Sequence, residues 1–245
     1  MRFIVVAVTL LVLHGTAPAQ QKDLVAKGKI ELASHTYKMN VGSLYHVKVE
    51  GKGFQPYALI QSGFLPFFAA GNAAERNTFQ SYYAPKESKE YRILIMPNLF
   101  GAGELPAGPL DYTLSVKPIA LGKAIVKAEG KWTDDDPLYT ARFPFGNQER
   151  KTHFKAYPLK MKAGNLYVID LIRNNEQNTD PYLFLEGPDG KVVTQDDDGD
   201  GNLNSRIIFP AKQDGNYRVI ATTLSPATGD FTLTVRAGTT GKHAE

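Results

Sequence analysis

The chain contains no cysteine and only five histidines. Without cysteine there are no disulfides, no thiol catalysis, no cysteine-ligated zinc and no lipoprotein anchor. No histidine lies in H-E-x-x-H or a similar metal spacing, and the Gly-x-Ser-x-Gly, P-loop and dinucleotide-binding patterns are also missing. We therefore predict that the protein is not an enzyme. Scattered Ser/His/Asp triads and carboxylate pairs for glycoside hydrolysis have no sequence signature, so these two alternatives stay open.

Long runs of one charge or of apolar residues are equally scarce. The 28 Lys and Arg are balanced by 25 Asp and Glu, with no basic stripe, which argues against nucleic acid as a partner. Phe3–Leu13 is apolar but shorter than the roughly 20 residues of a membrane span. With Arg2 before it and the small residues Ala17–Ala19 after it, this run is typical of a secretory signal peptide cut before Gln20. We expect residues 1–19 to be removed, no transmembrane anchor, and a secreted protein, periplasmic or extracellular.

An internal repeat organises the rest of the chain. Four segments recur in the same order about 119 to 126 residues later: Lys38–Tyr45 with Lys160–Tyr167, Gln55–Ile60 with Asp180–Leu185, Glu90–Ile95 with Asn216–Ala221, and Asp111–Val116 with Asp230–Val235. Two copies at so long a period differ from a solenoid, whose units are shorter and more numerous. The repeat predicts two domains, 20–118 and 119–238, followed by a flexible tail, 239–245.

The recurring segments alternate apolar and polar residues. Tyr45, Val47 and Val49 share one face of an expected strand, a period-2 pattern typical of strands with one buried and one wet face. Gly187–Gly190 (GPDG) predicts a hairpin turn, and the lone Trp132 is expected in a core. No capped helix is recognisable. We predict an all-β protein of two tandem antiparallel β-sandwich domains, jelly-roll-like.

The second copy carries a family resemblance. Its turns and strands read TDPYLFL, GPDGK, DDDGDGNLNSRI, DGNYRV and TGDFTLTV between Thr179 and Val235. This order resembles the bacterial pre-peptidase C-terminal (PPC) domain family, and the first copy is similar to it only through the internal repeat. The resemblance implies jelly-roll sandwiches of exported bacterial proteins, often placed behind a secreted peptidase. Related modules bind Ca²⁺, and some bind extracellular polymers. The two copies leave no room for a peptidase domain, so we expect a stand-alone role.

An acidic loop in the second copy resembles the start of a Ca²⁺ loop, with oxygens at alternate positions and a glycine at the sixth. The candidate ligands are the side chains of Asp196, Asp198 and Asp200, the backbone carbonyl of Asn202, and Asn204 directly or through water. Ile207 stands where an EF-hand has its bidentate Glu, so the loop needs help from elsewhere. Asp180, Asp189 or Asp134–Asp136 could supply it. The alternative is a solvated acidic turn without metal, and Asp134–Asp136 is itself read as a turn.

The first copy is rich in aromatic residues. Phe64, Phe67 and Phe68 replace the hairpin turn of the second copy, and we take them as a candidate partner-binding surface, with core packing as the alternative. Together these features predict a secreted, non-catalytic binding or structural module of the envelope or extracellular space, with Ca²⁺ as a stabilising ion. Its partner would be an extracellular polymer or protein. The alternatives are an accessory protein of a secreted hydrolase or peptidase, and an unrecognised hydrolase.

Overall fold

The protein is described by a computed structural model that covers residues 24–30, 33–61, 66–67, 72–75, 77–98, 110–142, 149–174, 179–200 and 202–239. Within these ranges the chain forms strands and no helix, which confirms the predicted all-β class. The expected signal peptide lies outside the described residues, as do residues 240–245 of the expected tail. Thr239, which was also predicted in the tail, is the last residue of β19 and pairs with Asn165.

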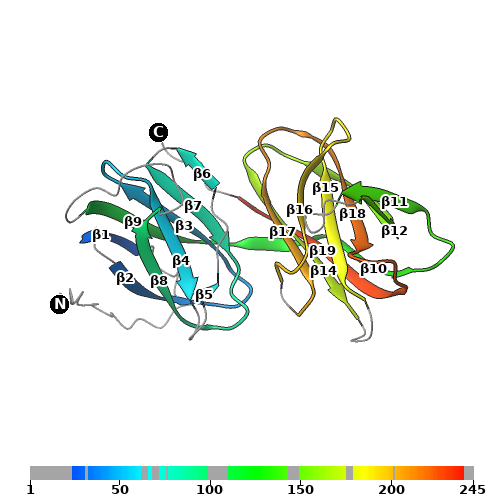
Figure 1. Cartoon of the computed structure of the whole chain (residues 1–245), viewed down its shortest axis with the longest axis horizontal. Coiled ribbons are helices and arrows are strands. Elements are labelled where there is room, and N and C mark those ends of the chain that lie inside the picture. The colour runs from blue at the N-terminus through cyan, green and yellow to red at the C-terminus, as the bar shows by residue number, and fades with distance from the viewer. Residues whose placement is uncertain are drawn as a thin grey trace.

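The strands of residues 24–119 form the first sandwich (Figure 1). One sheet has the order β1-β9-β3-β7-β6 and the other the order β2-β8-β4-β5. The strands are β1 (Leu24–Ile30), β2 (Ala33–Met39), β3 (Leu44–Gly51), β4 (Pro56–Gln61), β5 (Pro66–Phe67), β6 (Asn72–Glu75), β7 (Thr78–Tyr83), β8 (Lys89–Pro97) and β9 (Leu110–Ile119).

The strands of residues 121–239 form the second sandwich, with sheets β10-β19-β14-β17 and β13-β18-β15-β16 and a separate hairpin, β11-β12. All pairings are antiparallel. The strands are β10 (Leu121–Trp132), β11 (Leu138–Arg142), β12 (Glu149–His153), β13 (Lys155–Met161), β14 (Asn165–Arg173), β15 (Pro181–Glu186), β16 (Val192–Asp196), β17 (Ser205–Pro210), β18 (Gly215–Thr223) and β19 (Gly229–Thr239).

The two sandwiches share one strand order, as the sequence repeat requires. The series β1-β9-β3-β7 corresponds to β10-β19-β14-β17, and β2-β8-β4-β5 to β13-β18-β15-β16. Matching details recur at the start of β3 and β14. The hydroxyl of Tyr45 accepts the backbone N–H of Asn40, and that of Tyr167 accepts the N–H of Lys162, both at 2.8 Å. The turns before these strands place Gly42 and Gly164 at positive φ, where side chains are disfavoured.

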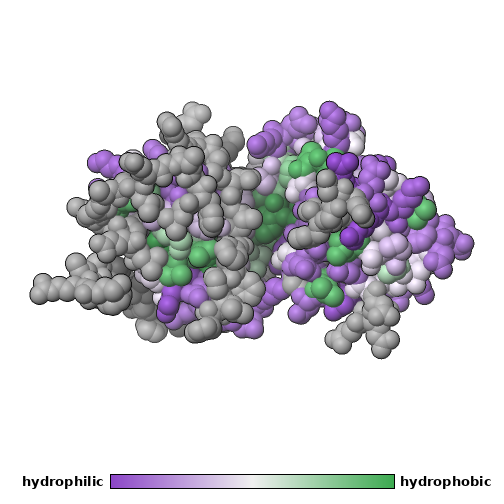
Figure 2. Space-filling view, in the orientation of Figure 1, coloured by the Kyte–Doolittle hydropathy of each residue, from purple (hydrophilic) through white to green (hydrophobic). Residues whose placement is uncertain are grey.

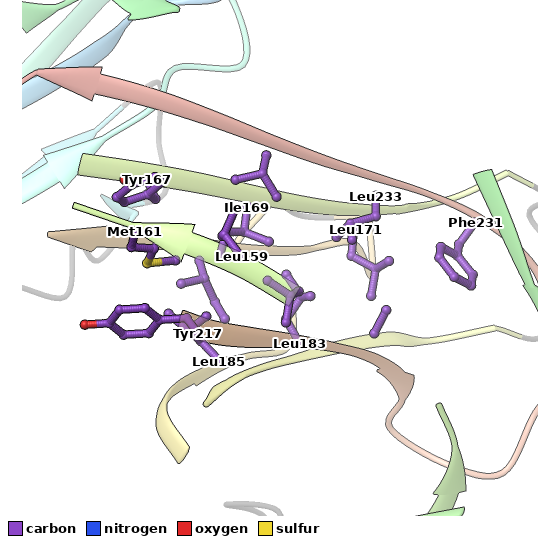
Figure 3. Packing of buried hydrophobic residues seen from close by; sticks show 14 of the residues in the cluster. Leu159, Met161, Tyr167, Ile169, Leu171, Leu183, Leu185, Tyr217, Phe231 and Leu233 are labelled. Carbon is purple, nitrogen blue, oxygen red and sulfur yellow. The ribbon is translucent and has the colours of Figure 1, made fainter. Parts of the chain in front are cut away.

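Each sandwich has its own apolar core between its sheets. In the second sandwich alternate residues of β14, β15, β18 and β19 point inward and pack together (Figure 3). Trp132 is fully buried there, as predicted, and its ring stacks on Phe231 at 4.2 Å between centroids. Gly130 leaves room for that ring, because a Cβ at this position would collide with Phe231. Burial of this aromatic pair stabilises the fold through the apolar area removed from water and through ring stacking.

A smaller apolar cluster joins the two sandwiches, which lie side by side along the long axis of the molecule (Figure 1). Its fully buried members are Leu44 from β3 and Leu166 and Val168 from β14, with Ile119 at the end of β9. These side chains belong to the outer faces of β3 and β14, so the two sheets contact each other through surfaces that do not serve either core. Figure 2 shows hydrophobic residues at this junction.

The hairpin β11-β12 has no counterpart among the described strands of the first sandwich. Residues 133–154 carry it between β10 and β13, whereas only residues 31–32 separate β1 from β2. Tyr139, Ala141 and Phe154 pack against Tyr182, Phe184 and Ile220 on the outer face of the β13-β18-β15-β16 sheet. Sequence analysis did not predict this hairpin. Its signal is the alternation of Tyr139 and Ala141 with exposed residues.

Candidate metal centre

Three carboxylates converge at one end of the second sandwich. Asp197 and Asp198 lie in the loop between β16 and β17, and Asp180 immediately precedes β15, the strand that pairs with β16. One oxygen from each residue can be chosen so that all three lie within 4.8 Å of one another. Oxygens that ligate Ca²⁺ lie about 2.3–2.6 Å from the ion, so two of them are at most about 5 Å apart. The three side chains therefore fit one ion.

The charges of this group are poorly compensated by other side chains. Burial and then the charge of Asp198 raise the pKa of Asp180, with Arg173 opposing the shift. Burial, followed by the charges of Asp180, Asp198 and Asp196, raises the pKa of Asp197 to about 6. One buried oxygen of Asp180, one of Asp197, and the hydroxyl of the neighbouring buried Thr179 have no hydrogen-bond partner in the described part of the chain. Buried polar atoms are normally paired, so oxygen atoms here have spare acceptor capacity.

The predicted ligand Asp196 is engaged with the backbone instead. Its Oδ2 accepts the N–H groups of Gly199 at 2.7 Å and Arg206 at 2.8 Å. These bonds fold the loop back on itself and require the glycine, because a Cβ at position 199 would approach the Asp196 carboxylate and the carbonyl of Arg206 within 2.7 Å. Asp196 thus shapes the loop that carries Asp197 and Asp198.

The predicted ligand Asp200 points toward an ion network rather than joining the three-carboxylate group. Its carboxylate lies 2.7 Å from a guanidinium nitrogen of Arg206. Arg206 also contacts buried Asp170 at 2.5 Å, and Arg236 contacts the same carboxylate at 2.8 Å. Burial raises the pKa of Asp200, and the charge of Arg206, which is the next largest cause, opposes this shift. The network lies on the outer face of β14, β17 and β19, beside the junction with the first sandwich.

The two predicted asparagines close the loop. The side-chain oxygen of Asn204 accepts the backbone N–H of Arg173 at 3.0 Å, and the Asn204 carbonyl accepts the N–H of Asp200 at 2.9 Å. Asn202 and Leu203 have φ of 54° and 61°, a left-handed conformation that Asn tolerates and Leu adopts only at a cost. Gly201 lies outside the described residues. Of the five predicted ligands, only Asp198 belongs to the group that the structure brings together.

The other acids considered as helpers divide in the same way. Asp180 joins the group, whereas Asp189 caps the predicted hairpin turn by accepting the N–H of Lys191 at 3.1 Å. Asp136 accepts the N–H of Thr133 at 2.8 Å and pairs with Lys155 at 2.5 Å. Asp134–Asp136 is therefore a turn, as the sequence indicated.

The predicted aromatic surface is only partly covered by the structure. Phe64 and Phe68 lie outside the described residues, and Phe67 is in β5, where its backbone lies opposite Ile60 of β4. Other aromatic residues of this copy fill the core, because Phe54 and Phe79 are 5% and 3% exposed.

Comparisons with known proteins leave the family open. No family model matches the chain, and no curated protein matches it. Among solved structures, the N-terminal CBM22-1-CBM22-2 tandem domain of Paenibacillus barcinonensis Xyn10C is 11% identical over 84% of this chain and 82% of that one, with a TM-score of 0.26. The infectious bursal disease virus VP2 subviral particle is 12% identical over 86% and 71%, with a TM-score of 0.24.

The described strands leave no candidate for a helical membrane span. No helix of sufficient length and apolar character to cross a bilayer occurs in the part of the chain that the structure describes.

Proposed function

We propose that the protein is an exported, non-catalytic binding or structural module of the envelope or extracellular space, whose second sandwich is stabilised by Ca²⁺. One observation carries the metal assignment: Asp180, Asp197 and Asp198 converge within the span of one ion while buried oxygens of Asp180 and Asp197 lack partners among the described residues. Clustered carboxylates repel one another unless a cation or a proton neutralises them. Membership in the PPC family and export both stay predictions.

The donor set favours Ca²⁺ over other common ions. All three side chains offer hard oxygen ligands, which suit Ca²⁺ and Mg²⁺, and no cysteine or histidine joins the group. Ca²⁺ accepts six to eight oxygens in flexible geometry, so three carboxylates with water can complete its shell, whereas Mg²⁺ demands a near-ideal octahedron. The bound ion would link the β16–β17 loop to the start of β15 and hold both in place.

A thermal melt of residues 20–245 tests the metal site. We expect Ca²⁺ added after EDTA to raise the melting temperature by several degrees, because an extracellular-type site with Kd near 0.1 mM gains about 2 kcal/mol at about 5 mM Ca²⁺. Mg²⁺ should have a smaller effect. In Asp180→Asn/Asp197→Asn the Ca²⁺ response should disappear.

The matched control is Asp134→Asn/Asp135→Asn, which removes two exposed carboxylates from the same sandwich. It should keep the response. If Ca²⁺ raised the melting temperature of both double variants equally, its effect would be general charge screening and not binding at this site. The non-catalytic role has a separate check: turnover of chromogenic esters, glycosides or casein by the purified protein would contradict it.

A further inference from the structure

The hairpin β11-β12 covers the outer face of the β13-β18-β15-β16 sheet in the second sandwich. Beneath it, Phe184 and Ile220 face each other across β15 and β18 and are 1% and 0% exposed. Thr222, also fully buried, shares a 2.7 Å hydrogen bond with Thr152 of the hairpin. At the edge, the buried carboxylate of Glu186 accepts the hydroxyl of Tyr139 at 2.9 Å.

The same face exists in the first sandwich in the same register. The pair Leu59–Leu94 of β4 and β8 corresponds to the pair Phe184–Ile220 of β15 and β18. In the same way, the pair Gln61–Arg92 corresponds to the pair Glu186–Arg218. Tyr57 lies opposite Met96 as Tyr182 lies opposite Thr222. Apolar character is thus kept on this face, and one polar position, that of Thr222, has become a methionine.

In the first sandwich, no hairpin among the described residues covers this face. Leu59, Leu94 and Met96 are only half-buried and belong to none of the hydrophobic clusters found in the described chain. We call these three residues, with Arg92, the β4-β8 face. Figure 2 shows hydrophobic residues reaching the surface where Figure 1 places β4 and β8. The equivalent face of the second sandwich is covered by a hairpin, and large apolar patches left on a protein surface mark interaction sites.

Charge on the β4-β8 face indicates what would cover it. In the second sandwich Arg218 is neutralised by Glu186 at 2.6 Å. In the first sandwich Gln61 replaces that acid, and exposed Arg92 has no ion pair within the described ranges. An occupant that brings its own carboxylate would restore the pair in a partly desolvated place, where charged hydrogen bonds are strong. The hairpin of a second copy fits less well, because Arg142, Arg150 and Lys151 make it basic.

We propose that the β4-β8 face binds an extended or hairpin segment of a partner protein that presents alternate apolar side chains and a carboxylate for Arg92. The inference names the partner chemistry of the binding role proposed above. It uses the first sandwich alone, so its test is independent of the metal in the second.

A selection with a defined probe tests this surface. A phage library of disulfide-closed hairpin peptides is selected on the whole mature protein and counter-selected on Leu94→Glu. We expect enriched peptides that alternate aromatic or aliphatic residues with Asp or Glu. In fluorescence anisotropy, Leu94→Glu and Arg92→Glu should each weaken a synthetic enriched peptide at least tenfold. Lys52→Glu, the same charge reversal at an exposed site of this sandwich, should bind it as the unmodified protein does.

Each other outcome overturns the proposal. If no peptide is enriched, the face does not bind such a segment. If the enriched peptides lack acidic residues and bind the Arg92→Glu variant as well as the unmodified protein, the partner needs no carboxylate for Arg92. A melting temperature for Leu94→Glu as low as that for Ile220→Glu would mean that the chain itself covers the face. A dimer in analytical ultracentrifugation that Leu94→Glu abolishes would assign the face to a second copy. The Ca²⁺ response of Leu94→Glu, measured in parallel, shows whether the metal proposal stands independently.

Discussion

At the scale of single residues, neighbouring aspartates of one loop make different contacts and have different structural roles. Asp196 accepts two backbone N–H groups, Asp200 pairs with Arg206, and Asp197 and Asp198 face Asp180. A carboxylate that satisfies two backbone donors stabilises the fold with or without metal. A carboxylate held near others of its own charge stabilises the fold only when a cation is bound or a proton is taken up.

This difference predicts opposite behaviour for two adjacent substitutions. Asp196→Ala should lower the free energy of unfolding by about 1–3 kcal/mol even in EDTA, because two backbone donors lose their acceptor. Asp198→Asn should change stability little in EDTA and should weaken the Ca²⁺ response. Urea unfolding with and without Ca²⁺ measures both. If Asp196→Ala were neutral in EDTA, the Asp196 carboxylate would not be a structural cap.

The pH dependence of the metal-free protein has a sign that follows from Asp197. Its pKa of about 6 in the folded state exceeds the value near 3.9 of an unfolded chain. Between about pH 4 and 6 the folded state therefore binds more protons, so the free energy of unfolding falls as pH rises through this window and stays lower above it. Asp197→Asn should remove this component in urea titrations with EDTA.

The control for the pH experiment is Asp135→Asn, which changes an exposed acid of the same sandwich. It should leave the slope unchanged. A slope that persists in Asp197→Asn would assign the titration to other acids.

At the scale of elements, the β11-β12 hairpin is fastened by polar as well as apolar contacts. The hydroxyl of Tyr139 donates to Glu186, which is 4% exposed and also receives Arg218. Burial and the neighbouring Glu186 raise the pKa of Tyr139 well above its usual value, so the hydroxyl keeps its proton and remains a donor. A buried carboxylate depends on each of its donors.

Removal of that hydroxyl should loosen the hairpin. Tyr139→Phe is expected to cost about 1.5–3 kcal/mol, the range for a hydrogen bond to a charged group, and to speed hydrogen exchange in β11 and β12 before the rest of the sandwich. Tyr157→Phe serves as the control, because the Tyr157 ring packs against the core and its hydroxyl makes no hydrogen bond to another described residue. Equal stability of the two variants would contradict a fastening role for the Tyr139–Glu186 bond.

At the scale of the whole molecule, the junction determines how the sandwiches face each other. Buried Leu44, Leu166 and Val168 join the outer faces of two sheets, and the Asp170–Arg206–Asp200 network lies beside them. The loop with the candidate metal centre is tied to this network through Asp200. The sandwiches therefore have a shared interface in addition to their separate cores.

A charge placed in the junction should separate the sandwiches without unfolding them. Leu44→Asp is expected to increase the radius of gyration in small-angle X-ray scattering and to split the thermal transition, because a carboxylate buried among the apolar side chains of the junction is costly. Val41→Asp, at a valine that is 58% exposed, should change neither quantity. An unchanged radius for Leu44→Asp would show that other contacts hold the two halves together.

The sequence by itself determined the all-β class, the hairpin at Gly187–Gly190 and the core position of Trp132. These features follow from local rules: period-2 alternation sets which side chains face inward, and Gly, Pro and Asp turns set where strands end. The four recurring segments also carried the shared strand order, because equal patterns of strands and turns pair in the same way.

Only the tertiary structure decided which carboxylates meet and which faces are covered. Spacing along the loop pointed to Asp196, Asp198 and Asp200, but the backbone turns at Gly199 and directs Asp197 and Asp198 to Asp180, which lies before another strand. The hairpin over Phe184 and the junction at Leu44 likewise join segments distant in sequence. Such contacts depend on how strands pair and sheets stack, and neither composition nor periodicity encodes that arrangement locally.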